Sequence, residues 1–293
     1  MAAVFLTGAS GFLGRHVSAR LRERGHVVTA LTRRMNAADP AGPAADLTRP
    51  ASYEAALAGV DTVVHLAAVT GKAAPAEYAR VNVDGTRGLA DAARRAGVTR
   101  FLFCSSIAVA FPDTSHYPYA ESKAAGERIV AASGLRFATI RPTIIGGPGS
   151  PVIAKLASLA ALPIIPAFGG GTARVQPILV DDLASLMVDL VDADRFSGEV
   201  LELGGRDVLS LRDLLGRLHS ARRQTPPRFL PVPMGLILAP LRLIEPLLGH
   251  SLPMTIGQLA TFRFDGVARP NSLWEARRDQ LATLDQILAP ALA

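Results

Sequence analysis

The sequence predicts an α/β protein: a Rossmann-type doubly wound parallel sheet, followed by a smaller and mostly helical C-terminal domain. Two observations support the sheet. Short apolar runs alternate with helical patterns through the first half of the chain, and a glycine-rich turn joins the first run to the first helical pattern. Strands that are apolar on both faces belong to parallel sheets covered by helices on both sides. A third observation supports the second domain, because the chain becomes rich in glycine and proline after residue 146.

The elements of the first half follow in order from these patterns. We expect strands at 3–8, 26–33, within 60–68, at 100–106 and at 135–145, where β-branched and large apolar residues gather. We expect helices at 11–25, 82–97 and 119–132, where apolar residues recur at helical spacing. Glycines at positions 25 and 97 end the first two helices.

The second half is less regular. Residues 175–193 and 198–205 are expected to return to the sheet, 209–220 to form a helix, and 224–293 to form amphipathic pieces interrupted by proline. We therefore expect residues 1–145, joined by 176–204, to form the first domain, and 146–175 with 205–293 to form the second.

Composition excludes several classes of protein. The chain of 293 residues carries a net charge of +6, but its arginines are scattered in pairs and aromatic residues make up only 5%, which is poor material for nucleic-acid binding. Cys104 is the only cysteine, so we expect no disulfide within the chain and no metal site. A reducing cytoplasm fits this composition.

Hydropathy raises the question of a membrane. The N-terminal apolar run ends in a glycine turn and lacks a basic region before it, so it reads as a strand and not as a signal peptide. No apolar stretch of about 18 residues lacks both charge and proline, so no spanning helix is expected. The mean hydropathy of +0.27 nevertheless indicates an apolar ligand cavity, an oligomer interface or contact with a membrane surface.

The turn after the first strand reads TGASGFLG and has the spacing of a phosphate-binding loop. A tight turn needs a residue without Cβ, a pyrophosphate must approach bare backbone, and the following helix N-terminus offers N–H donors. An ordinary strand–helix turn is the alternative. The strand–turn–helix context favours dinucleotide binding. The predicted contacts here are Gly8, Ser10, Gly11, Phe12, Leu13 and Gly14.

The end of the second strand bears on the choice of dinucleotide. An acidic residue there often holds the ribose 2′-hydroxyl of NAD(H), but the nearest groups here are Arg33 and Arg34. Two guanidinium groups could pair with a 2′-phosphate, so we favour NADP(H) over NAD(H). The alternative is that one arginine only covers the surface. Asp46 and Leu47 are expected near the adenine edge, although Asp46 could also be a solvated loop acid.

The stretch HYPYAESKA at 116–124 contains two tyrosines, of which one is placed for chemistry. Pro118 suits the first turn of a helix, so Tyr117 would precede it. Tyr119 and Lys123 are four residues apart and share one helical face. An ammonium one turn away lowers the pKa of a phenol, which suits proton transfer. Ser105 and Ser106 end the preceding strand, where a hydroxyl could hold a substrate oxygen.

These motifs together resemble the extended short-chain dehydrogenases/reductases, in the superfamily of NAD(P)-dependent epimerases and dehydratases. The matching stretches cover roughly residues 3–215 and read, in order, TGASGFLG, DL, VVHLAA, NVDGT, FLFCSSIAV, PYAESK, RPTIIGGPG and PILVDDLA. The resemblance implies that Tyr119 is the acid/base, that Lys123 holds the nicotinamide ribose and lowers the Tyr119 pKa, and that Ser106 orients a substrate carbonyl.

The resemblance also implies further contacts with the cofactor. Asn82 would lie near the site, and His65 would line the groove without acting as a base, because a lone histidine at a strand end is more often structural. The full set of cofactor contacts implied in this part of the chain is His65, Leu66, Ala67, Asn82, Ser105, Tyr119, Lys123, Pro142 and Ile144.

The chain departs from its sugar-handling relatives at informative places. Ile107, Ala108 and Val109 follow Ser106, where dehydratases of the family have an acidic pair, so dehydration is not expected. Val175 stands where many nucleotide-sugar members carry an arginine, and Arg174 is one residue away, on the other face of an extended segment.

Residues 231–249 are strongly apolar and contain only Arg242 and Glu245 as charges. This segment could line an apolar substrate channel, rest on a bilayer surface, or pack as a helix pair. Its apolar composition, interrupted by proline, is similar to that of the family branch with sterol-type dehydrogenases, bacterial ketoceramide reductases and relatives of a complex I accessory subunit.

The resemblance leaves three functions open. The favoured one is an NAD(P)H-dependent reductase of a bulky, apolar or lipid-like ketone, such as a 3-keto-sphingolipid or a sterol-like compound. The alternatives are a nucleotide-sugar epimerase or 4-ketoreductase, and a non-catalytic NADP(H)-binding subunit. We expect a cytoplasmic protein, at most peripheral to the inner membrane, that binds a small molecule and no nucleic acid, with a homodimer as one expected assembly.

Overall fold

The computed structural model describes residues 1–32, 44–248 and 255–292. Within them the chain forms two compact units. The first unit comprises Met1–Val109, Tyr119–Arg141 and Leu183–Leu201, and the second comprises Ala110–Pro118, Pro142–Asp182 and Glu202–Ala293. The boundaries of these units differ from the predicted domain boundaries at residues 110–118, 142–145, 176–182 and 202–204, all of which belong to the second unit.

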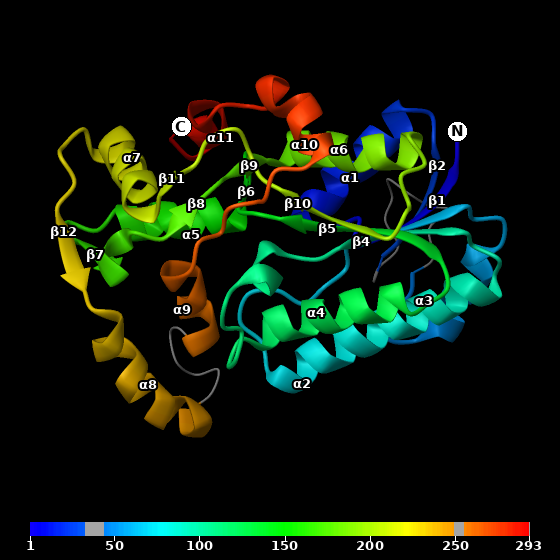
Figure 1. Cartoon of the computed structure of the whole chain (residues 1–293), viewed down its shortest axis with the longest axis horizontal. Coiled ribbons are helices and arrows are strands. Elements are labelled where there is room, and N and C mark those ends of the chain that lie inside the picture. The colour runs from blue at the N-terminus through cyan, green and yellow to red at the C-terminus, as the bar shows by residue number, and fades with distance from the viewer. Residues whose placement is uncertain (33–43, 249–254, 293) are drawn as a thin grey trace. The chain divides into compact units, whose positions relative to one another are not determined.

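A six-stranded sheet forms the centre of the first unit (Figure 1). Its order is β10-β5-β4-β3-β1-β2, and the pairs β1·β2, β1·β3, β3·β4 and β4·β5 are parallel. The strands are β1 (Ala3–Thr7), β2 (Val27–Leu31), β3 (Thr62–His65), β4 (Arg100–Cys104), β5 (Arg136–Pro142) and β10 (Glu199–Leu203). The chain winds outward from β1 to β2 and then in the opposite direction through β3, so the switch point of the fold lies between β1 and β3. The predicted Rossmann-type sheet is confirmed.

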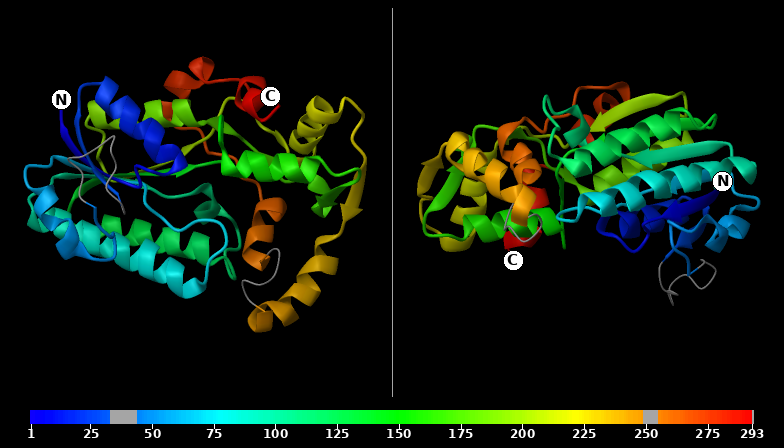
Figure 2. Two further views of the ribbon diagram at one scale, coloured as in Figure 1. Left: turned by 180° about the vertical axis from the view of Figure 1, so that it is seen from behind. Right: turned by 90° about the horizontal axis from the view of Figure 1, so that it is seen from below.

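Helices cover both faces of this sheet, as the views in Figures 1 and 2 agree. On one face lie α1 (Phe12–Glu23) and α6 (Val180–Asp192), which the Arg24 guanidinium joins through ion pairs of 3.2 Å to Asp189 and 2.8 Å to Asp192. On the other face lie α3 (Gly85–Arg95) and α4 (Pro118–Ala131). The prediction that 175–193 returns to the sheet is wrong for most of its length, because these residues form α6; the strand that does return is β10.

The predicted helix at 82–97 has a more complex start than its periodicity indicated. Helix α2 (Pro75–Tyr78) leads directly into a π-helical segment, η3 (Ala79–Asp84), and then into α3. Two short 3₁₀ turns, η1 (Pro50–Ser52) and η2 (Glu54–Leu57), precede β3, and η4 (Ile107–Ala110) follows β4. π-Helical turns in proteins often mark functional sites.

The second unit has a small core of its own. Its strands pair two by two: β6 (Ile145–Gly146) with β9 (Ile178–Leu179), β8 (Arg174–Val175) with β11 (Leu209–Ser210), and β7 (Ile165–Phe168) with β12 (Phe229–Val232). Its helices are α5 (Pro151–Ala160), α7 (Leu211–Arg223), α8 (Met234–Leu248), α9 (Ile256–Arg263), α10 (Ser272–Arg277) and α11 (Leu284–Leu292), with 3₁₀ turns η5 (Gly169–Gly171) and η7 (Arg278–Gln280). Leucines of α7 and α11 pack against α5 to form the core. The prediction of a mostly helical second domain agrees with these elements. No helix among the described residues is long and apolar enough to span a membrane.

Candidate active site

The glycine-rich turn lies at the switch point, with β1 before it and α1 after it. Gly8 has a φ of +76°, and a Cβ there would come within 2.7 Å of the Ala67 nitrogen on the loop after β3. A Cβ on Gly14 would come within 1.9 Å of the Gly8 carbonyl oxygen. Only glycine therefore permits this close approach of turn, helix and loop. Gly11 caps α1 without any side-chain hydrogen bond, which leaves the first N–H groups of the helix to a ligand.

The turn thus fits the pyrophosphate of a dinucleotide. Its other predicted residues also face outward to some degree: Ser10 is exposed, and Phe12 and Leu13 are half-buried. The backbone carbonyl of Ser10 accepts a hydrogen bond of 3.0 Å from Arg15. The turn presents bare backbone, which side chains at the glycine positions would cover. Phosphate groups bind to bare backbone of this kind at a helix N-terminus.

The residues predicted at the adenine end are placed only in part. Arg33 and Arg34 lie outside the described residues. Asp46 is half-buried, and its Oδ1 accepts hydrogen bonds of 2.9 Å each from the backbone N–H and the hydroxyl of Thr48. These bonds lower the pKa of the Asp46 carboxyl. The side chain of Leu47 is buried against Gly85, so it belongs to the core of the first unit rather than to a groove.

His65 at the end of β3 is a structural residue. It is 1% exposed; its Nδ1 lies 2.7 Å from the Thr7 hydroxyl, and its Nε2 lies 2.9 Å from the Thr86 hydroxyl. The Thr86 hydroxyl donates to the Asn82 carbonyl at 2.6 Å, so Nε2 carries the imidazole proton. Burial, with a smaller contribution from Lys123, lowers the pKa of His65 to about 3. The ring is therefore neutral, and the groove at this strand end is left to half-buried Leu66 and Ala67.

Asn82 is buried in η3 and connects two parts of the site. Its Oδ1 accepts a 2.7 Å hydrogen bond from the Val69 N–H. Its Nδ2 donates to the Val69 carbonyl and to the Ser122 hydroxyl, both at 3.0 Å. Ser122 in turn donates to the Tyr119 carbonyl at 2.7 Å. The side chain of Asn82 therefore holds the loop after β3 against the first turn of α4.

The first turn of α4 carries the predicted acid/base. Pro118 is its first residue, as its sequence position indicated, and Tyr117 precedes the helix. Tyr119 is half-buried, and its ring lies edge-on to that of Tyr78 with 6.2 Å between the ring centroids. The two serines after β4 differ in burial. Ser106 is half-buried and accepts a hydrogen bond from Ala108 N–H, whereas the buried Ser105 hydroxyl has no partner among the described residues.

Lys123 is 3% exposed, and its ammonium lies 4.6 Å from the centre of the Phe103 ring. Burial lowers the pKa of the Lys123 ammonium, while Cys104 and Glu127 oppose the shift. The Phe103 ring packs on the His65 ring. It also lies against α4 at Gly126, where an added Cβ would come within 2.6 Å of the Phe103 ring. Sequence reasoning missed Phe103, because only the pairing of β4 with β3 and the approach of α4 at Gly126 place this ring beneath the lysine.

The remaining predicted positions lie at the end of β5. Pro142 is the last residue of that strand and is buried. Ile144 is half-buried and packs against the core of the second unit. Their contact with a nicotinamide ring stays a prediction.

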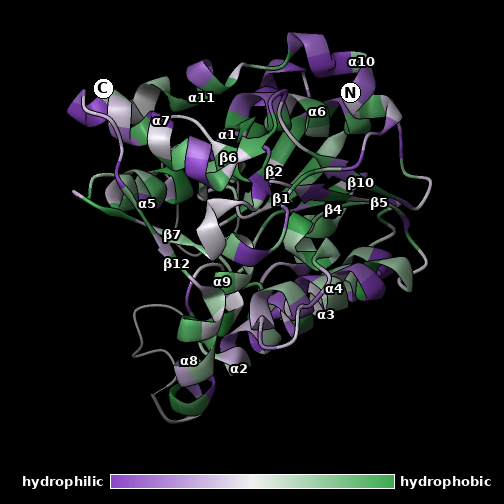
Figure 3. Ribbon diagram, turned by 60° about the vertical axis from the view of Figure 1, so that its left-hand side comes forward, coloured by the Kyte–Doolittle hydropathy of each residue, from purple (hydrophilic) through white to green (hydrophobic). Residues whose placement is uncertain are grey.

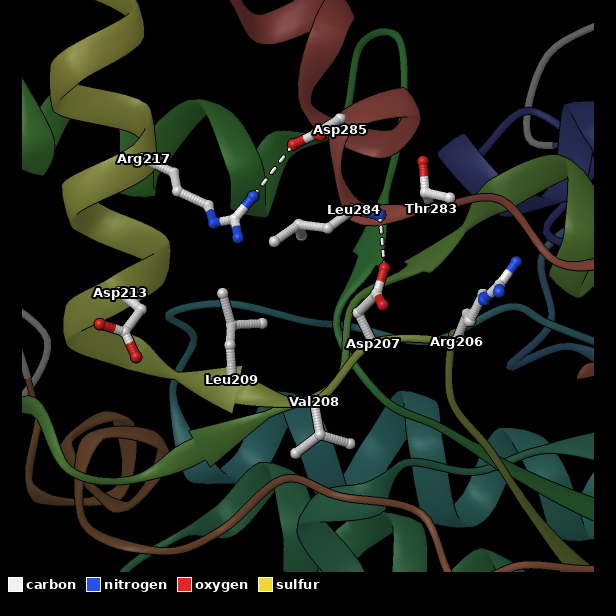
Figure 4. A pocket seen from close by; sticks show the side chains of 9 residues that line it. All are labelled: Arg206, Asp207, Val208, Leu209, Asp213, Arg217, Thr283, Leu284 and Asp285. Atoms are coloured by element: carbon white, nitrogen blue, oxygen red, sulfur yellow. Dashed lines mark hydrogen bonds and ion pairs between the residues drawn. The ribbon is translucent and has the colours of Figure 1, made fainter.

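A separate cavity of about 470 Å³ lies within the second unit (Figure 4). Its charged groups have structural roles: Arg217 pairs with Asp285 at 3.1 Å, and Asp207 accepts a 2.7 Å hydrogen bond from the Leu284 N–H at the start of α11. None of the predicted site residues lines it. The described residues also contain no group of three or more His, Cys, Asp or Glu that could hold a metal ion.

Comparison with characterised proteins places these features in a family. The family model described as the NAD dependent epimerase/dehydratase family matches residues 4–204. A ceramide reductase of Caulobacter vibrioides is 37% identical over 196 residues, which span 63% of this chain and 59% of that protein. A 3-beta-hydroxysteroid dehydrogenase of Mycolicibacterium neoaurum is 33% identical over 177 residues, spanning 50% of this chain and 48% of that protein. The chain thus covers less than two thirds of either relative.

Solved structures show the same fold. A UDP-glucose 4-epimerase of Thermus thermophilus in complex with NAD is 23% identical, with a TM-score of 0.64 over 79% of this chain and 86% of that one. The protein RMD of Pseudomonas aeruginosa in complex with NADPH is 25% identical, with a TM-score of 0.62 over 80% of this chain and 88% of that one. Because the family model matches more than half of its length, the chain belongs to the NAD-dependent epimerase/dehydratase family, the extended short-chain dehydrogenases/reductases.

Proposed function

We propose that this chain is an NADP(H)-dependent reductase of a bulky, apolar or lipid-like ketone, or the corresponding alcohol dehydrogenase in reverse. The observation that carries the proposal is the placement of Lys123. A buried ammonium lies four residues after Tyr119 on α4, in the same unit as a glycine turn that fits a dinucleotide. A protein with a purely structural role has no use for a buried cation at this position, since burying a charge costs stability.

The residues of the chain have distinct roles in the proposed reaction. Tyr119 donates its phenolic proton to the carbonyl oxygen, and the Ser106 hydroxyl donates a hydrogen bond that orients the same oxygen. The proposed role of Lys123, which is buried four residues further along α4, is to favour the phenolate form of Tyr119 through its positive charge. When bound, the nicotinamide cofactor supplies the hydride that adds to the carbonyl carbon. The glycine turn binds its pyrophosphate, and Asn82 keeps α4 in register with the loop after β3.

The choice of a lipid-like ketone rests on two kinds of support. The names of the two relatives, ceramide reductase and 3-beta-hydroxysteroid dehydrogenase, point to large apolar substrates. The chain also lacks free polar groups where sugar-handling relatives would use them. Ile107 and Ala108 are buried apolar residues after Ser106, so no carboxylate is available there for dehydration. Arg174 is engaged with Asp265, through hydrogen bonds of 2.8 Å from its backbone N–H and from its Nε.

A nucleotide-sugar epimerase or 4-ketoreductase is the second candidate. It is favoured by the likeness of the fold to a UDP-glucose 4-epimerase. Both candidates use the same proton donor and differ in the substrate. The ligand that co-purifies with the protein separates them: a lipid supports the ketone reductase, and a uridine or thymidine diphosphate sugar overturns it.

The substitution Tyr119→Phe tests the mechanism. It removes the proton donor but keeps the ring, so we expect the reduction of a 3-keto-sphingolipid or 3-ketosteroid to slow by about a thousandfold, while NADPH still raises the melting temperature. Tyr117→Phe is the matched control and should keep most of the activity. An unchanged rate for Tyr119→Phe would remove this tyrosine from the mechanism. Strong NADPH binding with no turnover of any ketone, in the wild type as well, would favour a non-catalytic NADP(H)-binding subunit.

The preference for NADP(H) rests on the arginine pair after β2. We expect NADPH to raise the melting temperature of the protein more than NADH does at equal concentration, because the guanidinium groups can pair with the 2′-phosphate. Arg33→Ala combined with Arg34→Ala should remove the difference between the two cofactors and leave the NADH effect in place. A larger effect of NADH on the wild type would reverse the assignment. A cytoplasmic location, with contact to a membrane surface and a homodimer, completes the proposal.

A further inference from the structure

Helix α8 presents apolar side chains away from its own unit. Leu236, Ala239, Pro240 and Leu243 follow one another at the three- and four-residue spacing of a single helical face, and all four are exposed. Leu236 is 72% and Leu243 is 76% exposed. Surface helices of globular proteins have polar residues at these positions. In Figure 3, hydrophobic residues, coloured green, recur along α8.

The opposite face of α8 explains how the helix is held. Met234, Leu238, Leu241 and Glu245 share this second face, and all are half-buried. Met234 lies against η5, where its side chain would be 3.2 Å from a Cβ on Gly169. The Glu245 carboxylate accepts a 2.7 Å hydrogen bond from the Ile256 N–H at the start of α9. The inner face of α8 therefore packs against its own unit, and the exposed apolar residues form the outer face of the helix.

The strand that precedes α8 in the chain carries a further exposed apolar residue. Leu230 on β12 is 57% exposed, and Ile244 adds to the far end of the helix. We call Leu230, Leu236, Ala239, Pro240, Leu243 and Ile244 the outer apolar face. Strand β12 pairs with β7 so that Leu230 lies beside Pro166, and the residues just before β7 include the exposed Leu162 and Ile164. Exposed apolar residues that gather in this way mark an interaction surface.

The charged residues in the segment that leads from the end of α7 through β12 and along α8 are nearly all of one sign. Residues 222–245 contain four arginines, and all of them are exposed: Arg222, Arg223, Arg228 and Arg242. The only acid in that range is Glu245, which is bonded to the start of α9. Residues 161–171 carry no charge. An apolar helix face with Arg242 on the same helix and Arg228 just before the preceding strand matches the surface of a bilayer that contains anionic lipids. A second copy packed face to face would instead bring like-charged arginines together.

We propose that the outer apolar face docks the protein onto the surface of an anionic phospholipid bilayer. Helix α8 has 15 residues and is therefore about 22 Å long, shorter than the roughly 30 Å hydrocarbon core of a membrane. It would lie along the interface, with Leu236 and Leu243 among the acyl chains and the arginines at the phosphates. Docking requires no turnover, so it stands or falls independently of the proposed reaction.

Flotation with vesicles tests the surface directly. The full-length protein should float with vesicles of equal parts phosphatidylcholine and phosphatidylglycerol, and much less with phosphatidylcholine alone. Leu236→Ser combined with Leu243→Ser should lower the partition onto anionic vesicles at least about tenfold. Arg242→Gln should lower it about fivefold, and high salt should do the same for the wild type. Val27→Ser combined with Val208→Ser is the matched control, since both valines are exposed and neither belongs to α8 or β12.

A second measurement does not depend on loss of binding. Cys104 is buried and burial raises its thiol pKa, so an introduced surface cysteine can be labelled selectively. An environment-sensitive fluorophore on Leu243→Cys should shift its emission to the blue with anionic vesicles, and one on Val208→Cys should not.

Three results would overturn the proposal. The first is a wild-type protein that does not float with anionic vesicles, and the second is a Leu236→Ser/Leu243→Ser variant that binds them as the wild type does. The third is a dimer in the absence of vesicles that the same variant converts to a monomer, because the outer apolar face would then be an interface between copies.

Discussion

In most proteins polar side chains are exposed and apolar side chains are buried. Two regions of this molecule depart from that pattern: the end of the first unit's sheet and the outer apolar face. Around β3, β4 and α4, polar groups such as His65, Asn82 and Lys123 are buried at 1%, 2% and 3% exposure. On α8, leucines are exposed while a carboxylate is tied to backbone. Burying polar groups and exposing apolar ones both cost free energy unless something compensates. Hydrogen bonds compensate for the burial of His65 and Asn82, and the Lys123 ammonium lies over the Phe103 ring. For the exposed leucines of α8 we propose that the compensation comes from a bilayer.

Among the changes that test this contrast, the largest expected effect concerns Lys123, and it separates activity from stability. Lys123→Met keeps the shape of the side chain but removes the charge, so we expect the turnover rate to fall about a hundredfold. Because burial lowers the pKa of the ammonium, the folded state disfavours its charge, and the variant should be more stable than the wild type at neutral pH. Rate assays and urea denaturation measure the two effects.

Lys155→Met is the control, since Lys155 is exposed on α5. It should change neither quantity appreciably. A Lys123→Met protein that is less stable than the wild type would show that the buried ammonium stabilises the fold. That result would contradict the prediction that its burial costs stability.

The next effect is the dependence of stability on pH that His65 imposes. Its folded pKa of about 3 lies below the ordinary value of 6.5, so the unfolded chain binds the extra proton first as the pH falls. Stability from this residue is complete near neutral pH and is lost progressively between about pH 6.5 and 3. Between pH 7 and pH 5 the loss should be about 2 kcal/mol.

Urea denaturation of the wild type and of His65→Gln at both pH values checks this. The variant is less stable at pH 7 but should lose about 2 kcal/mol less than the wild type on going to pH 5. Equal losses in the two proteins would mean that His65 is not buried as a neutral ring.

The smallest effect sharpens the contrast at α8. Leu236→Ser combined with Leu243→Ser should change the free energy of unfolding by no more than about 0.5 kcal/mol per residue, because neither side chain is buried. Leu214→Ser in the core of the second unit should cost about 4 kcal/mol. If the α8 leucines prove as costly as Leu214, they are buried in solution and the outer face is not free.

The sequence predicted site geometry best where that geometry depends on a few neighbouring residues. The glycine spacing at 8–14 and the four-residue step from Tyr119 to Lys123 each depend on one turn of chain, so their geometry can be worked out without the fold. The roles of Phe103 and Asn82 depend on strand pairing and on the hydrogen bonds of η3, which no local pattern encodes. For the same reason 175–193 was misread: a run of apolar residues around Asp181 and Asp182 suits a strand or a helix, and packing decides between them.

One set of hydrogen bonds connects the start of the glycine turn with α4. It passes from the Thr7 hydroxyl to His65, on to Thr86, then through Asn82 to Ser122 and the Tyr119 carbonyl. Every group in it belongs to the first unit. If the second unit binds the substrate, as the proposed function has it, substitutions there can change the substrate while Tyr119 keeps the hydrogen bonds that support its helix. One reaction could then serve different substrates in different relatives.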